Sequence, residues 1–173
     1  MAVMAVLFVA CANMGRPEGG ARDEMPPEFV RSNPAPGSLR VDRQRLDVWF
    51  DENIQLDDAF NKVIVSPTQT QAPTVRSVGR HLYVELRDSL KPNSTYTIDF
   101  ADAIKDLNEG NVLDGFALDF STGDSIDTLR LSGMVLQARN LEPAQAMTVG
   151  IYSNPTDTSL TKVKFERVTR TNQ

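Results

Sequence analysis

The sequence predicts an all-β chain folded as an antiparallel β-sandwich, and three observations lead to this prediction. Apolar and polar residues alternate between Arg45 and Gly123, which is the pattern of strands that bury one face. Pro, Gly and Asn interrupt this alternation at short intervals. No stretch between them has the length of a stable independent helix.

The chain begins with an apolar run, residues 1–11, which ends in the only cysteine, Cys11. A bilayer span needs about 20 apolar residues, so this run has the size of a signal-peptide hydrophobic region instead. Leu7 to Cys11 resembles the lipobox of bacterial lipoproteins, which implies that Cys11 becomes the first mature residue and carries a lipid. The alternative is a free cysteine buried on a first strand. We expect residues 1–10 to be a signal-peptide remnant and the Gly- and Pro-rich residues 11–27 to be a lipidated tether.

Four strands follow from the strongest alternation, each with three apolar residues on one face. These residues are Leu46, Val48 and Phe50; Leu82, Val84 and Leu86; Tyr96, Ile98 and Phe100; and Phe116, Leu118 and Phe120. Shorter strands are predicted at Glu28–Arg31, Val63–Val65 and Thr74–Val78, the last of which turns at Gly79.

About seven short strands within roughly 100 residues is the pattern of an immunoglobulin-like sandwich. Between the strands, Leu56–Lys62 and Ala101–Leu107 are each expected to form one or two helical turns. Leu90, Pro92 and Tyr96 resemble the tyrosine corner of sandwich domains, in which the phenol bonds to upstream backbone. We expect these three residues to be structural.

The composition excludes several classes of function. The chain has 18 Lys and Arg against 23 Asp and Glu, a formal charge of −5, whereas a nucleic-acid-binding domain carries a basic patch. One cysteine and one histidine exclude an internal disulfide and a multi-histidine zinc site. We therefore expect neither a nucleic-acid partner nor a cofactor.

Two sets of residues are candidates for catalytic groups. Asp51 and Glu52 are neighbours on a strand and point to opposite faces, whereas a paired-carboxylate hydrolase needs two acids facing one bond. His81 lies on the polar phase of its strand, and the nearest serines, Ser77 and Ser89, carry no nucleophile motif. We expect no enzyme activity from this chain.

Two aromatic residues, Trp49 and Tyr83, lie on the polar phase of their strands, opposite the core positions. If these strands are neighbours, the two rings form an exposed aromatic platform for a glycan or a protein partner. The alternative is that each ring packs under a loop.

One loop gathers the oxygen ligands that calcium accepts, namely those of Asp102, Asp106, Asn108 and Asn111. Their spacing does not reproduce the twelve-residue EF-hand loop. Asx-rich turns satisfy their own backbone without a metal, so we expect plain turns, with calcium as the alternative.

Seven short sequence segments resemble, in order and spacing, the bacterial Ig-like domain that is also found in S-layer proteins, as it occurs in Gram-negative envelope lipoproteins. The segments are Pro26–Pro27, Ser32–Gly37, Val48–Ile54, Val63–Pro67, Leu90–Tyr96, Asp106–Asn111 and Phe120–Gly123. The resemblance spans Asp23 to Gly123, and we place the Ig-like domain at residues 28–123.

After Gly123 the sequence changes character. Leu129–Val135 and Val149–Tyr152 resemble the opening of a carboxypeptidase-regulatory-like, prealbumin-type β-sandwich. Because only about three strands fit into residues 124–173, we expect an incomplete second β-sandwich of a truncated chain.

The resemblance implies a non-enzymatic protein of the cell envelope, anchored by its N-terminal lipid in the outer membrane. Its Ig-like domain is expected to be a spacer or a module that binds a protein or a glycan. The alternative is an accessory domain of an envelope enzyme whose catalytic part lies beyond the C-terminus.

Overall fold

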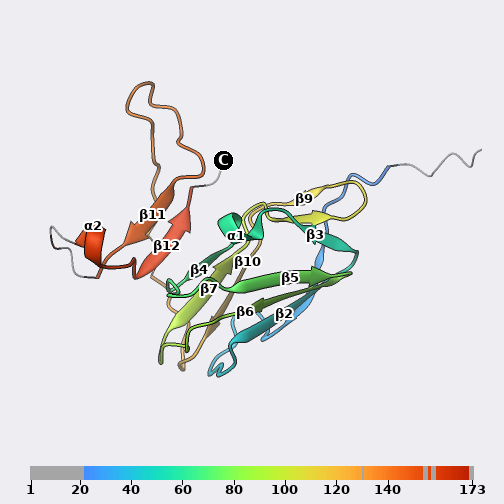
Figure 1. Cartoon of the computed structure of the whole chain (residues 1–173), viewed down its shortest axis with the longest axis horizontal. Helices are drawn as coiled ribbons and strands as arrows, with labels where there is room; N and C mark the ends of the chain where they lie inside the picture. The colour runs from blue at the N-terminus through green and yellow to red at the C-terminus, as the bar shows by residue number, and fades with distance from the viewer. Residues whose placement is uncertain (1–21, 130, 154–155, 157–158, 172–173) are drawn as a thin grey trace, which may run out of the picture.

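Two antiparallel sheets pack face to face and enclose the apolar faces of their strands (Figure 1). The computed structural model describes residues 22–129, 131–153, 156 and 159–171. The first sheet contains β1 (Phe29–Asn33), β2 (Arg45–Phe50), β6 (His81–Glu85) and β5 (Thr74–Val78), in that spatial order. The second sheet contains β10 (Ala117–Ser121), β7 (Thr95–Asp99) and β4 (Ile64–Ser66).

The hydrophobic core lies between these two sheets and consists mainly of the predicted alternating residues. Val48, Leu82 and Val84 from the first sheet are completely buried, as are Ile98 and, just after β7, Phe100. Burying a side chain of this size contributes roughly 1.5–3 kcal/mol relative to leaving it in water. The predicted all-β sandwich is confirmed.

A third, smaller sheet covers one end of the core and consists of β3 (Ile54–Leu56), β8 (Ile104–Asp106) and β9 (Val112–Leu113). The helical turns expected at Ala101–Leu107 are therefore wrong, because residues 101–102 form a turn, with Ala101 at a φ of +47°, and residues 104–106 form a strand. Ile104 and Asp106 are buried and pair with Leu56 and Ile54, so pairing with β3 determines this segment. The only helical turn between β3 and β4 is α1 (Ala59–Lys62), inside the range that was predicted.

Lysine–aspartate ion pairs connect α1 to this third sheet. Lys62 Nζ lies 2.8 Å from Asp57 Oδ2 and 2.9 Å from Asp102 Oδ2, and Lys105 Nζ of β8 lies 2.8 Å from the same Asp57 oxygen. Hydrogen bonds from Lys105 and Lys62 lower the pKa of Asp57 to about 2. Asp57 is therefore charged at neutral pH.

The turn of the β5–β6 hairpin is hydrogen-bonded to the end of β2 and to the start of β3. Its two-residue turn starts at Gly79, whose φ of +59° lies in the left-handed region that favours glycine. The Gly79 carbonyl accepts a hydrogen bond from the Ile54 N–H at 3.0 Å, and the Arg80 carbonyl accepts one from the Phe50 N–H at 2.9 Å. The turn thereby holds the start of β6 beside the end of β2.

Beyond residue 123, β11 (Thr148–Ile151) pairs with β12 (Arg167–Arg170), and α2 (Ser159–Lys162) lies between them. Where the structure describes this segment, two strands form instead of about three, because residues 131–135 are not in a strand and only an isolated bridge joins Leu136 to Pro143. Among the described residues of this segment, none belongs to the hydrophobic core. No described helix is both long and apolar enough to cross a membrane.

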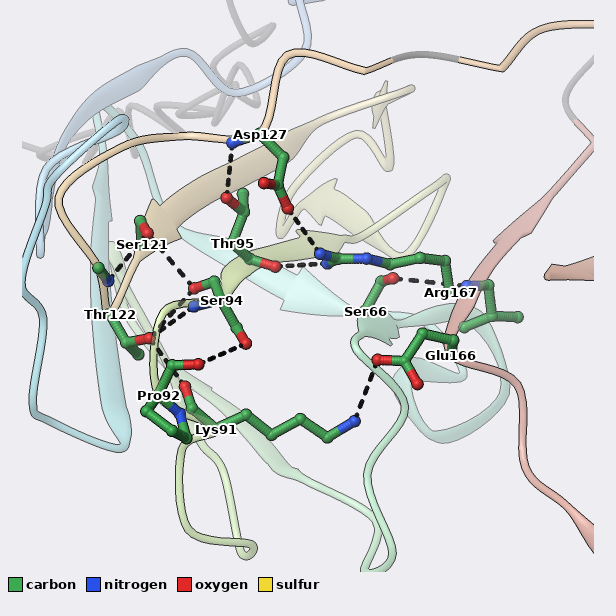
Figure 2. Close-up of polar contacts among 12 residues, drawn as sticks. Ser66, Lys91, Pro92, Ser94, Thr95, Ser121, Thr122, Asp127, Glu166 and Arg167 are labelled. Atoms are coloured by element: carbon green, nitrogen blue, oxygen red, sulfur yellow. Dashed lines mark hydrogen bonds and ion pairs between the residues drawn. The ribbon is translucent and has the colours of Figure 1, made fainter. Parts of the chain in front are cut away.

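Polar contacts hold β12 against the second sheet (Figure 2). Arg167 donates to the Thr95 carbonyl at 2.5 Å and to Asp127 Oδ2 at 2.8 Å. The Val168 N–H donates to Ser66 Oγ at 3.4 Å, beside the edge of β4. This segment is thus attached to the sandwich by hydrogen bonds and ion pairs instead of a shared core.

Candidate binding surface

The pairing of β2 with β6 brings Trp49 and Tyr83 to one surface. In this antiparallel register Trp49 lies opposite His81, and Asp47 lies opposite Tyr83. The residues that alternate with them are buried in the core, so these four side chains project from the outer face of the first sheet. The two rings are on neighbouring strands, as the aromatic platform requires.

The three rings of this face form a row with an arginine at each end. The ring centroids of Trp49 and His81 are 4.8 Å apart at an interplanar angle of 17°, and those of His81 and Tyr83 are 6.0 Å apart. The Arg31 guanidinium carbon lies 3.6 Å from the Trp49 ring centroid, and that of Arg45 lies 4.4 Å from the Tyr83 centroid. Cation–π contacts at exposed sites contribute about 0.5–1 kcal/mol each.

Asp47 lies within this row and is held by two partners. Its Oδ1 lies 2.9 Å from His81 Nε2 and 2.9 Å from Arg45 Nη2. Partial burial acts to raise the pKa of Asp47, but the hydrogen bonds from Arg45 and His81 outweigh it and the pKa lies below its usual value. The carboxylate is therefore ionised at neutral pH and orients both neighbouring side chains.

Strand β5 extends the surface, because Arg76 lies opposite Tyr83 and Val78 lies opposite His81. Both β5 side chains are exposed. We use the name aromatic face for the part of this sheet's outer face that surrounds the row of rings. Its residues are Arg31, Arg45, Asp47, Trp49, Thr74, Arg76, Val78, His81, Tyr83 and Glu85.

The residues considered as catalytic groups, Asp51, His81 and Ser77, are not arranged as a catalytic site. The Asp47–His81 contact resembles the orienting half of a catalytic triad, but among the described residues no hydroxyl or thiol is hydrogen-bonded to the ring. Ser77 lies opposite Leu82, a core residue, and so points to the other face from His81. Asp51 Oδ1 accepts the Glu28 N–H at 2.7 Å and secures the start of β1.

The acidic loop after β8 uses its carboxylates to hold its own backbone. Asp106 is fully buried, and its two oxygens accept N–H groups of Glu109 at 2.6 Å, Gly110 at 2.9 Å and Asn111 at 2.7 Å. Burial acts to raise the pKa of Asp106, but these bonds outweigh it and lower the pKa. Within the described part of the chain, no three His, Cys, Asp or Glu side chains gather as a metal site would require. The geometry is that of Asx-type turns.

Tyr96 has the geometry of a tyrosine corner. Its hydroxyl accepts the Lys91 N–H at 2.8 Å, and its buried ring stacks on Phe120 with centroids 5.3 Å apart. Leu90 packs against the core, and the Pro92 carbonyl accepts the Ser94 hydroxyl at 3.0 Å.

Thr122 secures the other side of this corner, as Figure 2 shows. Its hydroxyl donates to the Lys91 carbonyl at 2.8 Å and accepts the Ser94 N–H at 2.9 Å. Sequence reasoning missed this residue, because only the folded chain brings it to the corner.

Sequence reasoning also missed the arginines of the aromatic face. Arg45 shares the polar phase of β2 with Trp49, so its spacing was a usable signal. Arg31 gave no such signal, because a register shift between Phe29 and Arg31 sets which side chains of β1 meet β2. The lipidation candidate Cys11 lies outside the described residues.

The comparison with protein families agrees with this fold. A family model for the bacterial Ig-like domain matches residues 23–122, which confirms that prediction from the sequence. No curated protein matches the chain. A solved structure of an L,D-transpeptidase from Mycobacterium smegmatis is similar at 19% identity and a TM-score of 0.38, covering 72% of this chain and 59% of that one. The chain thus spans less than two thirds of that protein's length.

Proposed function

We propose that this chain, which belongs to the bacterial Ig-like domain family, is a non-enzymatic module of a lipid-anchored envelope protein and binds a partner through its aromatic face. The observation that supports this most is the row of three half-buried rings ending in arginines, beside the exposed residues Arg76 and Val78 of β5. Protein interfaces are enriched in Trp, Tyr and Arg and depleted in Lys.

The arrangement of the rings favours a protein over a glycan. Strands β1 and β6 flank β2, so Arg31 and His81 cover opposite faces of the Trp49 ring. A sugar that stacks on an aromatic residue needs one free ring face, whereas a protein partner can contact ring edges and the outward guanidinium groups.

The anchor is proposed at Cys11, in the outer membrane. Asn111 Nδ2 donates to the carbonyls of Asp23 and Met25, at 3.0 Å each, and so fixes the end of the tether beside β9. We expect Cys11→Ser in the precursor to move the protein from the detergent phase to the aqueous phase in phase partitioning. Unchanged partitioning would contradict the anchor.

Residues 124–173 are proposed as the start of a second β-sandwich. The face of the β11–β12 hairpin and residues 131–135 line a groove of about 670 Å³, and Leu131 and Met134 on its wall are largely exposed. An apolar groove of this size is what an inner sandwich face presents when its covering layer is absent.

Photo-crosslinking in intact cells tests the binding surface. Benzoylphenylalanine placed at Val78, which is 72% exposed beside the ring row, should crosslink a partner in the envelope. The same group placed at Phe60, which is 81% exposed on α1, is the matched control and should not. Equal crosslinking from both positions, or none from position 78, would contradict binding through the aromatic face and would favour a spacer role for the domain.

A further inference from the structure

We infer that the partner of the aromatic face is an acidic protein segment that crosses the strands in an extended conformation. This inference rests on the proposed function, and it adds the chemical class of the partner. Three observations carry it: the positive charge of the aromatic face, the lack of acidic partners for some of its arginines, and the distance between those arginines.

The aromatic face is cationic on an acidic chain. Its three arginines are joined by Arg87, which lies just past β6 and donates to Thr74 Oγ1 at 2.7 Å. These four arginines stand against two carboxylates, Asp47 and Glu85, whereas the chain as a whole carries −5. All four cations are arginines, whose planar fork binds carboxylates through two hydrogen bonds and is less strongly hydrated than an ammonium group.

Among the described residues, three of these four arginines have no acidic partner, namely Arg31, Arg76 and Arg87, the last of which bonds only to the Thr74 hydroxyl. Arg45 is neutralised within the face, because Asp47 lies 2.9 Å and Glu85 3.7 Å from its guanidinium. Arg31 on β1 and Arg76 on β5 are both exposed and available to a partner's carboxylates.

The spacing of these two arginines predicts the spacing of the partner's acids. Strands β1 and β5 are the two edges of a four-stranded sheet, so three strand intervals of about 4.8 Å, or about 14 Å, separate them. The strand register places Arg31 in line with Val78, two residues or about 6.6 Å along β5 from Arg76, so the two backbone positions are about 16 Å apart. An extended peptide advances about 3.3 Å per residue, so two acidic residues about four to five positions apart reach both guanidinium groups through their side chains. The residues between them lie over the rings of Trp49, His81 and Tyr83.

Binding can be followed by the fluorescence of Trp49, because it is the only tryptophan of the chain and lies within the row of rings. The probe is a blocked peptide of sequence Gly-Glu-Thr-Leu-Thr-Glu-Gly, with its glutamine counterpart as the matched peptide and polygalacturonate as an acidic glycan. We expect the glutamate peptide to change Trp49 emission saturably, and to bind more weakly as ionic strength rises.

The variant Arg76→Ala leaves the Arg31–Trp49 contact in place and should weaken binding of this peptide about tenfold, as expected for one lost charge-assisted pair. Arg139→Ala makes the same charge change on an exposed residue of the C-terminal segment and should leave binding unchanged.

Three results would overturn the inference: no response to any probe, equal binding of the glutamine peptide, or binding of polygalacturonate alone. If one of these occurs while position 78 still crosslinks a partner, the binding surface holds and only the partner class is wrong.

Discussion

The tyrosine corner predicts a defined loss of stability in Tyr96→Phe. The substitution removes one oxygen and leaves the ring, which stays stacked on Phe120. The Lys91 N–H then loses the acceptor that lies 2.8 Å away. A donor left without a partner costs about 1–3 kcal/mol, and because this bond is only partly buried we expect about 1–2 kcal/mol.

The assay is urea unfolding of the whole chain, followed by Trp49 fluorescence, with the free energy of unfolding extrapolated to water. For a domain of about 100 residues, a loss of 1 kcal/mol lowers Tm by roughly 4–8 °C. Tyr83→Phe is the matched control, since no hydrogen bond to its hydroxyl occurs within the described residues, and it should change stability by less than about 0.5 kcal/mol. A loss below about 0.3 kcal/mol in Tyr96→Phe, or an equal loss in the control, would refute the reasoning.

Two further predictions concern charge. The two lysine partners hold the folded pKa of Asp57 at about 2, below its unfolded value, so they contribute stability that is complete above about pH 4 and is lost as the pH falls towards 2. Asp57→Asn should flatten that part of the stability–pH curve, and an unchanged curve would contradict the assignment. Arg167→Met should speed amide exchange in β11 and β12 while Val84 and Ile98 stay protected, because this segment has polar attachments and shares no core. Tail amides as slow as those two core amides would show a single integrated domain.

The sequence predicted the elements whose structure follows from local signals. Thr74–Val78 is a strand with the predicted bounds, because its three β-branched residues and the glycine turn that follows specify it locally. The three residues of β8 were not predicted, because a strand so short is specified by pairing with β3, half the domain away in sequence, and with the two-residue β9. The sequence did not predict the bounds of β12, because its residues Arg167–Arg170 show no alternation of apolar and polar residues.

The candidate site was predicted only in part for a similar reason. Trp49 and Tyr83 were selected from their polar phase, and that phase follows from the core positions between them. His81 was considered only as a base, because its place between two rings depends on the cross-strand register. Arg31 joins the row from a strand whose register shifts.

Hydroxyl-radical footprinting tests the central claim, that the aromatic face is covered in the cell, most directly. Oxidation of Trp49 and Tyr83 would be compared between the purified protein and the same protein in native envelopes. Phe60, on α1, serves as the internal control because it is exposed and lies outside the aromatic face. The account predicts that Trp49 and Tyr83 are protected several-fold in envelopes while Phe60 is oxidised equally in both samples. Equal oxidation of all three residues in both samples would contradict it.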